Sequence, residues 1–542
     1  MSARVLLGDE AVALAAIHAG ITAAYAYPGT PSTEITESIL QFAREAAVAG
    51  RPAPHAAWCA NEKTAYEAAL GVSLAGRRAL VAMKHVGLNV AADPFINSAL
   101  VAIQGGLVVA VADDPGMHSS QNEQDSRVLA DFARIICLEP KDQPQAYAMT
   151  REAFELSERF HIPIMIRLVT RLAHSRATVL FREPDAERRL SPAQHRRDWI
   201  LLPGNARRRW RDLLDRQRLF QEFTAATPFN ELQLRDRGLG VIAAGVGRNY
   251  LDESLDDLAV VPSVLHIGAY PIPAGLVRQL AAHVERILVL EDGYPVIEHA
   301  LRGLLPHTTK IRGRESGHLP ADGELTPDSV RVALGLRVRR GQTAPINVPD
   351  RPPMLCAGCP HLDTFHALQI ALTGLPRGLV ASDIGCYTLA ALPPLEAIDS
   401  CVCMGASVGM ARGASEAGLR PAVAVIGDST FLHSGVTPLM DAVASDTDMT
   451  LVIADNEVVA MTGAQPTLLP SSRLRPLVLG LGVDPAHCHV IDVHPRRTAE
   501  NAAVIRREIE HHGLSVILAV RPCIEAAKAK NFSAKAVEGV VL

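Results

Sequence analysis

Short apolar runs alternate with helix-length segments along this chain, and this alternation is the feature that most limits its fold. An apolar run that ends in a polar or glycine-rich turn is typical of a buried strand. Strands that alternate with helices predict parallel sheets with helices on both faces. The clearest runs are RALVAMKHVGLNV (78–90), GLVVAVADDPG (106–116), IPIMIRLVTR (162–171), AVAVIGDST (422–430), MTLVIADN (449–456) and LSVILAV (514–520). We therefore predict an α/β fold with several parallel-sheet domains.

A chain of 542 residues can bury several separate cores. Changes of composition divide it into four segments. We predict an N-terminal α/β domain over 1–180, a basic helical linker over 181–235, a second α/β domain over 236–345, and a last α/β domain over 346–542 that begins in a proline-rich stretch. The content of 48% hydrophobic and 20% charged residues is that of a soluble globular protein.

The charge balance and the N-terminus limit the partners and the compartment. A net charge of -5 is too close to neutral to indicate nucleic acid as a general partner. No apolar run reaches the roughly 20 residues that a membrane helix needs. The N-terminal stretch carries Asp9 and Glu10 and has no cleavage pattern, so we expect a cytoplasmic protein. Nine unevenly spaced cysteines then indicate metal or redox chemistry rather than a disulfide framework.

Two polar motifs follow strand-like runs in the last domain. Gly427 and Asp428 begin GDSTF, with Ser429 next, and Asn456 follows the run MTLVIAD. Magnesium prefers oxygen ligands and shares them with phosphate. Asp428, the Asn456 side-chain oxygen and the backbone carbonyl of Val458 would supply three, and helix starts would offer amides to a diphosphate. A lone Gly-Asp-Ser often only ends a strand, but the pair predicts a magnesium and thiamine diphosphate site.

Four cysteines bracket this predicted site: Cys356, Cys359, Cys386 and Cys523. Thiolates from separate loops suit a [4Fe-4S] cluster, and they also suit structural zinc. Ordinary buried thiols are a third interpretation. Cys401 and Cys403 precede a small-residue helix and are interpreted as packing residues, although one of them could replace a ligand.

Two residues of the N-terminal domain are candidates for catalysis. Glu62 lies where a strand passes into a helix, in NEKTAYEAALG (61–71). A carboxylate there could act on the aminopyrimidine ring of thiamine by acid–base catalysis. A helix-start glutamate favoured by the helix dipole is the structural alternative. Thr30 is presented by the proline-rich turn YPGTPSTE (27–34), which could equally be a simple helix cap.

Together these strings resemble the 2-oxoacid:ferredoxin oxidoreductases, and most closely the large subunits of the indolepyruvate members. The resemblance is carried by YPGTPSTE, NEKTAYEAALG, MKHVGLNVAADP, VADDPGMHSSQNEQDSR, CAGCPH, DIGCYTLAALPPL, CMGASVGMA, GDSTFLHSG, DNEVVAMTGAQP and RPC. It implies a thiamine-diphosphate-binding fold with pyrimidine, transketolase-C-like and diphosphate domains. It implies that Glu62 activates the cofactor ring and that Thr30 lies near the substrate carbonyl. It makes Asp428 and Asn456 magnesium ligands, and it assigns the four bracketing cysteines to a cluster near the thiazolium.

The resemblance also implies a reaction and partners. The reaction is oxidative decarboxylation of a 2-oxoacid, such as the arylpyruvate indolepyruvate, to an acyl-coenzyme A. Electrons would pass through one [4Fe-4S] cluster to ferredoxin or to a partner. A smaller β subunit and pairing of two copies of this chain are expected. Because no cysteine-rich segment follows Cys523 in this sequence, we expect the family's C-terminal ferredoxin-like domain to be lacking.

Three alternatives stay open from the sequence. One is a non-oxidative thiamine-dependent decarboxylase or carboligase, in which the cysteines are core residues. Another is a relative that passes electrons to a flavin-containing partner. The third is a non-catalytic scaffold subunit, which would have no need of Glu62, Asp428 and Asn456.

Overall fold

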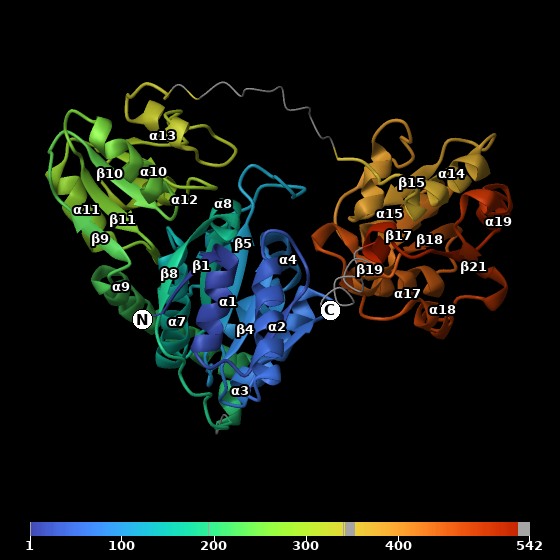
Figure 1. Cartoon of the computed structure of the whole chain (residues 1–542), viewed down its shortest axis with the longest axis horizontal. Coiled ribbons are helices and arrows are strands. Elements are labelled where there is room, and N and C mark those ends of the chain that lie inside the picture. Colours follow the sequence, from blue (N-terminus) through green and yellow to red (C-terminus); the bar gives the residue numbers. More distant parts are fainter. Residues whose placement is uncertain (1, 193–194, 340, 342–352, 529–542) are drawn as a thin grey trace, which may run out of the picture. The chain divides into compact units, whose positions relative to one another are not determined.

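The computed structural model describes residues 2–192, 195–339, 341 and 353–528 (Figure 1). The chain divides into two compact units, Met1–Thr343 and Ala344–Leu542. Each unit contains parallel sheet packed against helices, which confirms the predicted α/β class. The predicted domain boundary between 345 and 346 lies outside the described residues. Within the described ranges, no helix is both long enough and apolar enough to cross a membrane.

The first unit is built on a seven-stranded sheet in the order β12-β6-β7-β5-β4-β2-β3. Its strands are β2 (Ala23–Ala26), β3 (His55–Trp58), β4 (Ala79–Lys84), β5 (Leu107–Asp113), β6 (Cys137–Leu138), β7 (Ile164–Val169) and β12 (Ala269–Tyr270). Strand β12 pairs antiparallel with β6, and the other neighbours pair in parallel. Every residue of β4, β5 and β7 is buried, as expected for strands with helices on both faces.

Eight helices accompany this sheet in the described part of the first unit's N-terminal half (Figure 1). They are α1 (Gly8–His18), α2 (Thr33–Val48), α3 (Glu62–Leu74), α4 (His85–Val90), α5 (Ala92–Ser98), α6 (Ser126–Phe132), α7 (Gln143–Phe160) and α8 (Thr170–His174). The ends of α7 follow from its sequence. Asp142 accepts a hydrogen bond from the Gln145 N–H at its start, and His161 ends it in the left-handed conformation. An antiparallel pair, β1 (Ser2–Leu7) and β8 (Arg176–Phe181), brings the two ends of this region together.

A second sheet in the first unit has the order β14-β13-β10-β11-β9. Its strands are β9 (Asn230–Gln233), β10 (Gly240–Ala244), β11 (Ser263–Ile267), β13 (Arg286–Leu290) and β14 (Lys310–Arg312). Its neighbouring helices are α9 (Pro203–Ala226), α10 (Gly247–Ser254), α11 (Ala274–His283), α12 (Val296–Leu304) and α13 (Pro327–Ala333). Buried Arg127 joins the two sheets, because it donates to the Asp125 carboxylate and to the carbonyls of Asp292 and Tyr294.

The second unit contains a six-stranded parallel sheet in the order β16-β15-β17-β18-β22-β21. Its strands are β15 (Leu379–Ser382), β16 (Ser400–Cys401), β17 (Ala422–Gly427), β18 (Met449–Asp455), β21 (Cys488–Asp492) and β22 (Leu514–Val520). Alternate residues of β17 enter different cores: Ala424 and Ile426 enter one, and Val423 and Val425 enter the other. This alternation is the two-sided burial that the apolar run AVAVIG predicts.

Helices and one hairpin complete the second unit. The helices are α14 (Pro360–Leu372), α15 (Ala406–Glu416), α16 (Asp428–Thr430), α17 (Val436–Ala444), α18 (Ser471–Gly480) and α19 (Thr498–Glu510), and the hairpin strands are β19 (Val458–Val459) and β20 (Gln465–Pro466). Most of these elements begin just after a strand ends. The loops at the carboxyl edge of the sheet therefore carry the candidate site.

Candidate active site

Four neighbouring strands of the second unit end beside the polar residues that the sequence singled out. Cys386 follows β15, Asp428 follows β17, Asn456 follows β18 and Cys523 follows β22. Because parallel strands end at the same edge of a sheet, their following residues converge. Gly427 pairs in register with Ala454, so Asp428 lies opposite Asp455, the last residue of β18.

Asp428 and Asp455 form a buried acidic pair at this edge. The Glu457 N–H lies 3.0 Å from Asp428 Oδ2 and 3.2 Å from Asp455 Oδ1. Among the described residues, Asp455 Oδ2 has no hydrogen-bond partner. Burial raises the pKa of Asp428 well above its usual range, and the Asp455 carboxylate raises it further. Two carboxylates that repel one another in a buried place, with one oxygen unsatisfied, fit a divalent cation.

Asn456 is held from several sides. Its Oδ1 accepts from the Val458 N–H at 3.3 Å, and its Nδ2 lies 3.3 Å from His361 Nε2. Burial lowers the pKa of His361 to about 4, so the ring is neutral and its Nε2 can accept a hydrogen bond from the amide N–H. The backbone carbonyl of Asn456 accepts a hydrogen bond from the Cys523 N–H at 3.1 Å. The predicted magnesium ligand is therefore a fixed group.

Gly427 is required by close packing at the end of β17. A Cβ at this position would lie 2.6 Å from Cε1 of Tyr387, whose ring crosses the strand end. Ser429 lies in the short helix α16 directly after Asp428, and the Thr430 hydroxyl donates to the Ile384 carbonyl at 3.0 Å. These contacts join the ends of β15 and β17.

The four predicted cluster cysteines are brought together. Cys359 N–H donates to the Cys356 carbonyl at 3.0 Å, in a turn that Gly358 completes with a φ of +79°. Burial raises the pKa of Cys386 to about 11, and negative charge on the other three cysteines contributes to that rise. Cys359 is buried at the start of α14, and its carbonyl accepts from the Leu362 N–H at 3.1 Å. Burial raises the pKa of its thiol, and the backbone N–H groups of His361 and Leu362 act in the opposite direction. The four thiols are near enough to influence one another electrostatically, as ligands of a bridging cluster would be. Among the described residues, no three of their sulfurs lie within 4.8 Å of one another, as ligands of a single ion would.

Cys401 and Cys403 form a separate pair. Cys401 has Thr388, Asp383 and Cys403 as its polar neighbours, with its Sγ 4.0 Å from Thr388 Oγ1. Cys403 is exposed, so its interpretation as a packing residue was wrong. The reason is that it lies in the turn before α15, outside both cores of the sheet.

Glu62 is the buried first residue of α3 in the first unit. The Asn61 side chain caps this helix by accepting from the Thr64 N–H at 2.9 Å. Glu62 lies over Gly87 of α4, because a Cβ on Gly87 would lie 2.5 Å from Glu62 Oε1. The neighbouring helix thus leaves room for this carboxylate only because residue 87 is glycine.

Thr30 lies beside a buried lysine. The Ser119 hydroxyl donates to the Thr30 carbonyl at 3.3 Å, and Lys84 Nζ donates to the Ser119 carbonyl at 2.8 Å. Asp114 accepts from the Ser119 N–H at 2.8 Å and from the Ser120 hydroxyl at 2.6 Å. Burial lowers the pKa of Lys84 to about 8, while the Asp114 carboxylate acts in the opposite direction.

Comparison with known proteins decides the family. The model of the pyruvate flavodoxin/ferredoxin oxidoreductase thiamine diphosphate-binding domain matches residues 14–233, and that of the C-terminal TPP-binding domain of thiamine pyrophosphate enzymes matches 383–518. The indolepyruvate oxidoreductase subunit IorA of Archaeoglobus fulgidus is 36% identical over 96% of this chain and 86% of its own length. The IorA of Pyrococcus abyssi is 36% identical over 96% of this chain and 85% of its own. This chain belongs to the indolepyruvate oxidoreductase subunit IorA family.

A solved structure supports the fold of this IorA-family chain. The 2-oxoglutarate:ferredoxin oxidoreductase from Magnetococcus marinus matches it with a TM-score of 0.51 and 17% identity, over 61% of this chain and 65% of that one. The predicted membership of the 2-oxoacid oxidoreductases is confirmed. The two family models also support thiamine diphosphate binding, with one matching each unit of the IorA-family chain.

Three residues of the candidate site were missed by reasoning from the IorA-family sequence. Asp455 was counted as the end of a strand, although its register opposite Asp428 makes it part of the acidic pair. His361 follows directly after CAGCP and contacts Asn456. Lys84 ends the buried strand β4, and a lysine at the carboxyl end of an otherwise apolar strand was the available signal.

Proposed function

We propose that this chain catalyses thiamine-dependent oxidative decarboxylation of an arylpyruvate, such as indolepyruvate, to the acyl-coenzyme A. Electrons pass through one [4Fe-4S] cluster to ferredoxin or to a partner subunit. The hydrogen bond from the Cys523 N–H to the Asn456 carbonyl carries this proposal. It holds one of the four cysteines next to the proposed cation-binding edge, which is where a redox thiamine enzyme needs its electron acceptor. A non-oxidative lyase has no need of a cysteine set at that edge.

In this proposal Asp428, Asn456 and the Val458 carbonyl hold Mg²⁺, and Gly427 and Ser429 adjoin the diphosphate. The unsatisfied oxygen of Asp455 beside Asp428 supports a cation at this edge. When bound, thiamine diphosphate supplies the carbon nucleophile and the electron sink for decarboxylation. The chain's own contribution is to fix the oxygen ligands, which the Glu457 N–H does for both carboxylates.

Cys356, Cys359, Cys386 and Cys523 are the proposed cluster ligands. Their thiols do not ionise readily by themselves, because burial raises the pKa of Cys359 and of Cys386. Positive iron would reverse that balance, since a coordinated thiol loses its proton. The backbone N–H groups of His361 and Leu362 oppose the rise in the pKa of Cys359, and N–H groups beside a ligand sulfur are of the kind that tunes a cluster's reduction potential.

In the first unit, Glu62 is proposed to exchange a proton with the aminopyrimidine ring, and Thr30 to lie near the substrate carbonyl. Glu62 is buried and packed against Gly87, so its carboxylate has a fixed position. A group that exchanges a proton with a cofactor depends on such positioning. We further propose that the Lys84 ammonium attracts the carboxylate of the 2-oxoacid. Its contact with Ser119, which also bonds the Thr30 carbonyl, supports this role.

A smaller second subunit and a second copy of this chain complete the proposed enzyme. The relatives carry the word subunit in their names, which supports the first of these partners.

Composition and turnover of the anaerobically purified complex test the proposal. We expect one thiamine diphosphate and about four irons per chain, together with dye reduction that requires indolepyruvate and coenzyme A. Thiamine without iron, with carbon dioxide released in the absence of an acceptor, would instead indicate the non-oxidative lyase. Zinc in place of iron at the cysteines would remove the electron path.

A further inference from the structure

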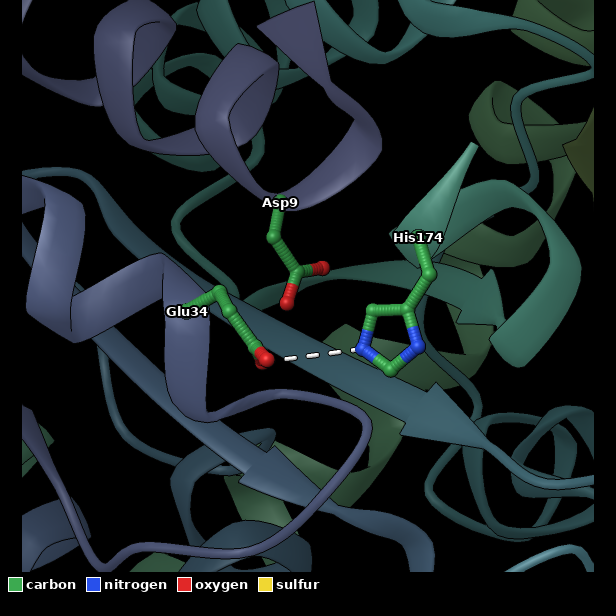
Figure 2. Close-up of side chains that lie close together, drawn as sticks. All are labelled: Asp9, Glu34 and His174. Carbon is green, nitrogen blue, oxygen red and sulfur yellow. Dashed lines mark ion pairs between the residues drawn. The ribbon is translucent and has the colours of Figure 1, made fainter. Parts of the chain in front are cut away.

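Three side chains from different helices of the first unit meet, and none of them has been assigned a role above. Asp9 belongs to α1, Glu34 to α2, and His174 is the last residue of α8. One ligand atom from each lies within 4.8 Å of the others. Figure 2 shows the Asp9 carboxylate pointing toward the Glu34 carboxylate and the His174 ring. Glu34 Oε2 and His174 Nε2 are 3.6 Å apart.

Asp9 is fully buried, with an exposed fraction of 0%, and neither of its carboxylate oxygens has a hydrogen-bond partner among the described residues. A buried carboxylate in this condition is costly unless a cation or a proton compensates it. Helix capping does not explain it. The neighbouring Glu10 performs that task, because it accepts from the Leu7 N–H at 2.7 Å.

The backbone holds Asp9 in this place. A Cβ on Gly8 would lie 2.3 Å from the Leu172 carbonyl oxygen, so the first turn of α1 is pressed against α8. Only glycine at position 8 permits this close approach of α1 to α8. Asp9, the next residue, is thereby directed toward His174 at the end of α8. Glu34 and His174 are partly exposed, which leaves an approach for an ion from solvent.

We infer that Asp9, Glu34 and His174 bind a divalent transition-metal ion of the zinc class. Without the ion, His174 and Glu34 form an ion pair that raises the pKa of the imidazole. Binding of a divalent ion would displace the imidazole proton and leave two carboxylates and one neutral imidazole, a set whose charge balances the ion. The imidazole favours zinc-like ions over magnesium and calcium, which prefer oxygen alone. Zinc bonds of about 2.0–2.1 Å place tetrahedral ligand atoms about 3.3 Å apart. The separation of 3.6 Å between Glu34 Oε2 and His174 Nε2 is close to that value.

The ion has a structural task in this reading. Glu34 lies in the first turn of α2, just after the turn that carries Thr30. His174 ends the helix that starts at Thr170, whose hydroxyl donates to Asp114 at 2.7 Å. The ion therefore ties α1 to α2 and α8, and of these α2 follows the turn that carries Thr30 and α8 contacts Asp114.

Metal content of the full chain, purified with its partner, is the test. Zinc and iron are measured together after dialysis against a weak chelator. Cobalt is then titrated and followed by its visible absorption, a readout separate from turnover. We expect one zinc-class ion per chain. D9N and H174Q should each weaken its binding by at least about 100-fold, with iron and thiamine content unchanged. E45Q alters an exposed glutamate of α2 outside the cluster and should bind metal normally.

Other outcomes overturn the inference. Zinc that persists in D9N and H174Q but is lost in C356S belongs to the cysteines. No bound metal, together with a rise in the melting temperature of D9N, would mean that Asp9 is simply protonated or unpaired. If D9N does not fold, H174Q decides the matter, because His174 is partly exposed and its loss disturbs no core.

Discussion

Gly87→Ala is the substitution that tests most directly whether the position of Glu62 matters. The added methyl group would lie 2.5 Å from Glu62 Oε1, 2.7 Å from its Cγ and 2.8 Å from its Cδ. Because ordinary contact begins near 3.4 Å, the carboxylate must move by about 0.9 Å. The backbone conformation at Gly87 permits alanine, because this residue lies in helix α4 and alanine has the higher helix propensity.

The expected effect falls on catalysis more than on folding. A misplacement of about 1 Å in a catalytic group can lower the rate about 100-fold, or about 2.7 kcal/mol of activation free energy. Overpacking costs about 1–3 kcal/mol of unfolding free energy, and the gain in helix propensity offsets up to about 1 kcal/mol of it. We therefore expect a folded Gly87→Ala protein with normal thiamine content and a greatly lowered kcat.

Anaerobic dye reduction with indolepyruvate and coenzyme A measures kcat, and calorimetry measures stability. Gly71→Ala is the matched control, because this exposed glycine of α3 has no atom within 4 Å of an added Cβ. It should keep full activity and gain up to about 1 kcal/mol. A kcat for Gly87→Ala within threefold of wild type, with thiamine bound, would refute the idea that the Glu62 carboxylate must stay where it is.

The remaining predictions concern single groups. Glu62→Gln should abolish turnover while thiamine diphosphate stays bound, because it removes only the proton exchange; normal turnover would contradict the assignment. Cys523→Ala should lose the iron, whereas Cys403→Ser, at an exposed site outside the set, should keep it; unchanged iron in the first would point to another ligand. Lys84 loses its positive charge as the pH rises through about 8, so KM for the 2-oxoacid should increase above that pH. Lys84→Met should have a high KM at every pH, and a pH profile like wild type would exclude the role.

Much of the fold can be predicted from the sequence because each buried parallel strand is a short, continuous apolar run. The runs AVAVIG and MTLVIAD are apolar on both faces, and each became a strand with its polar residue at the carboxyl end. The same rule predicted that Asp428 and Asn456 follow neighbouring strands at one edge of the sheet, and β17 and β18, which precede them, do pair. The strands β6 and β12 have two residues each, and their pairing depends on contacts distant in sequence, so no local pattern could reveal them.

Residues missed in the site share a physical reason. Lys84 is unusual because of its burial and its bond to Ser119, and burial is a property of the folded chain. Asp455 belongs to the site because the pairing of β17 with β18 aligns it with Asp428. The sequence of either strand alone does not determine the register of that pairing. Asp9 was noted in the sequence only as a charge that argues against a signal peptide. Its unsatisfied carboxylate appears only after α8 folds against Gly8.

The link between the two predicted cofactor sites is a continuation of the sheet itself. Strands β18 and β22 pair up to Asp455 and Val520. Two backbone hydrogen bonds follow beyond the strand ends: the Arg521 N–H donates to the Asp455 carbonyl at 3.0 Å, and the Cys523 N–H donates to the Asn456 backbone carbonyl at 3.1 Å. Backbone hydrogen bonds thus fix the spacing between a proposed magnesium ligand and a proposed cluster ligand. Loop motion cannot alter the spacing between these two backbone groups without breaking the hydrogen bonds that join them.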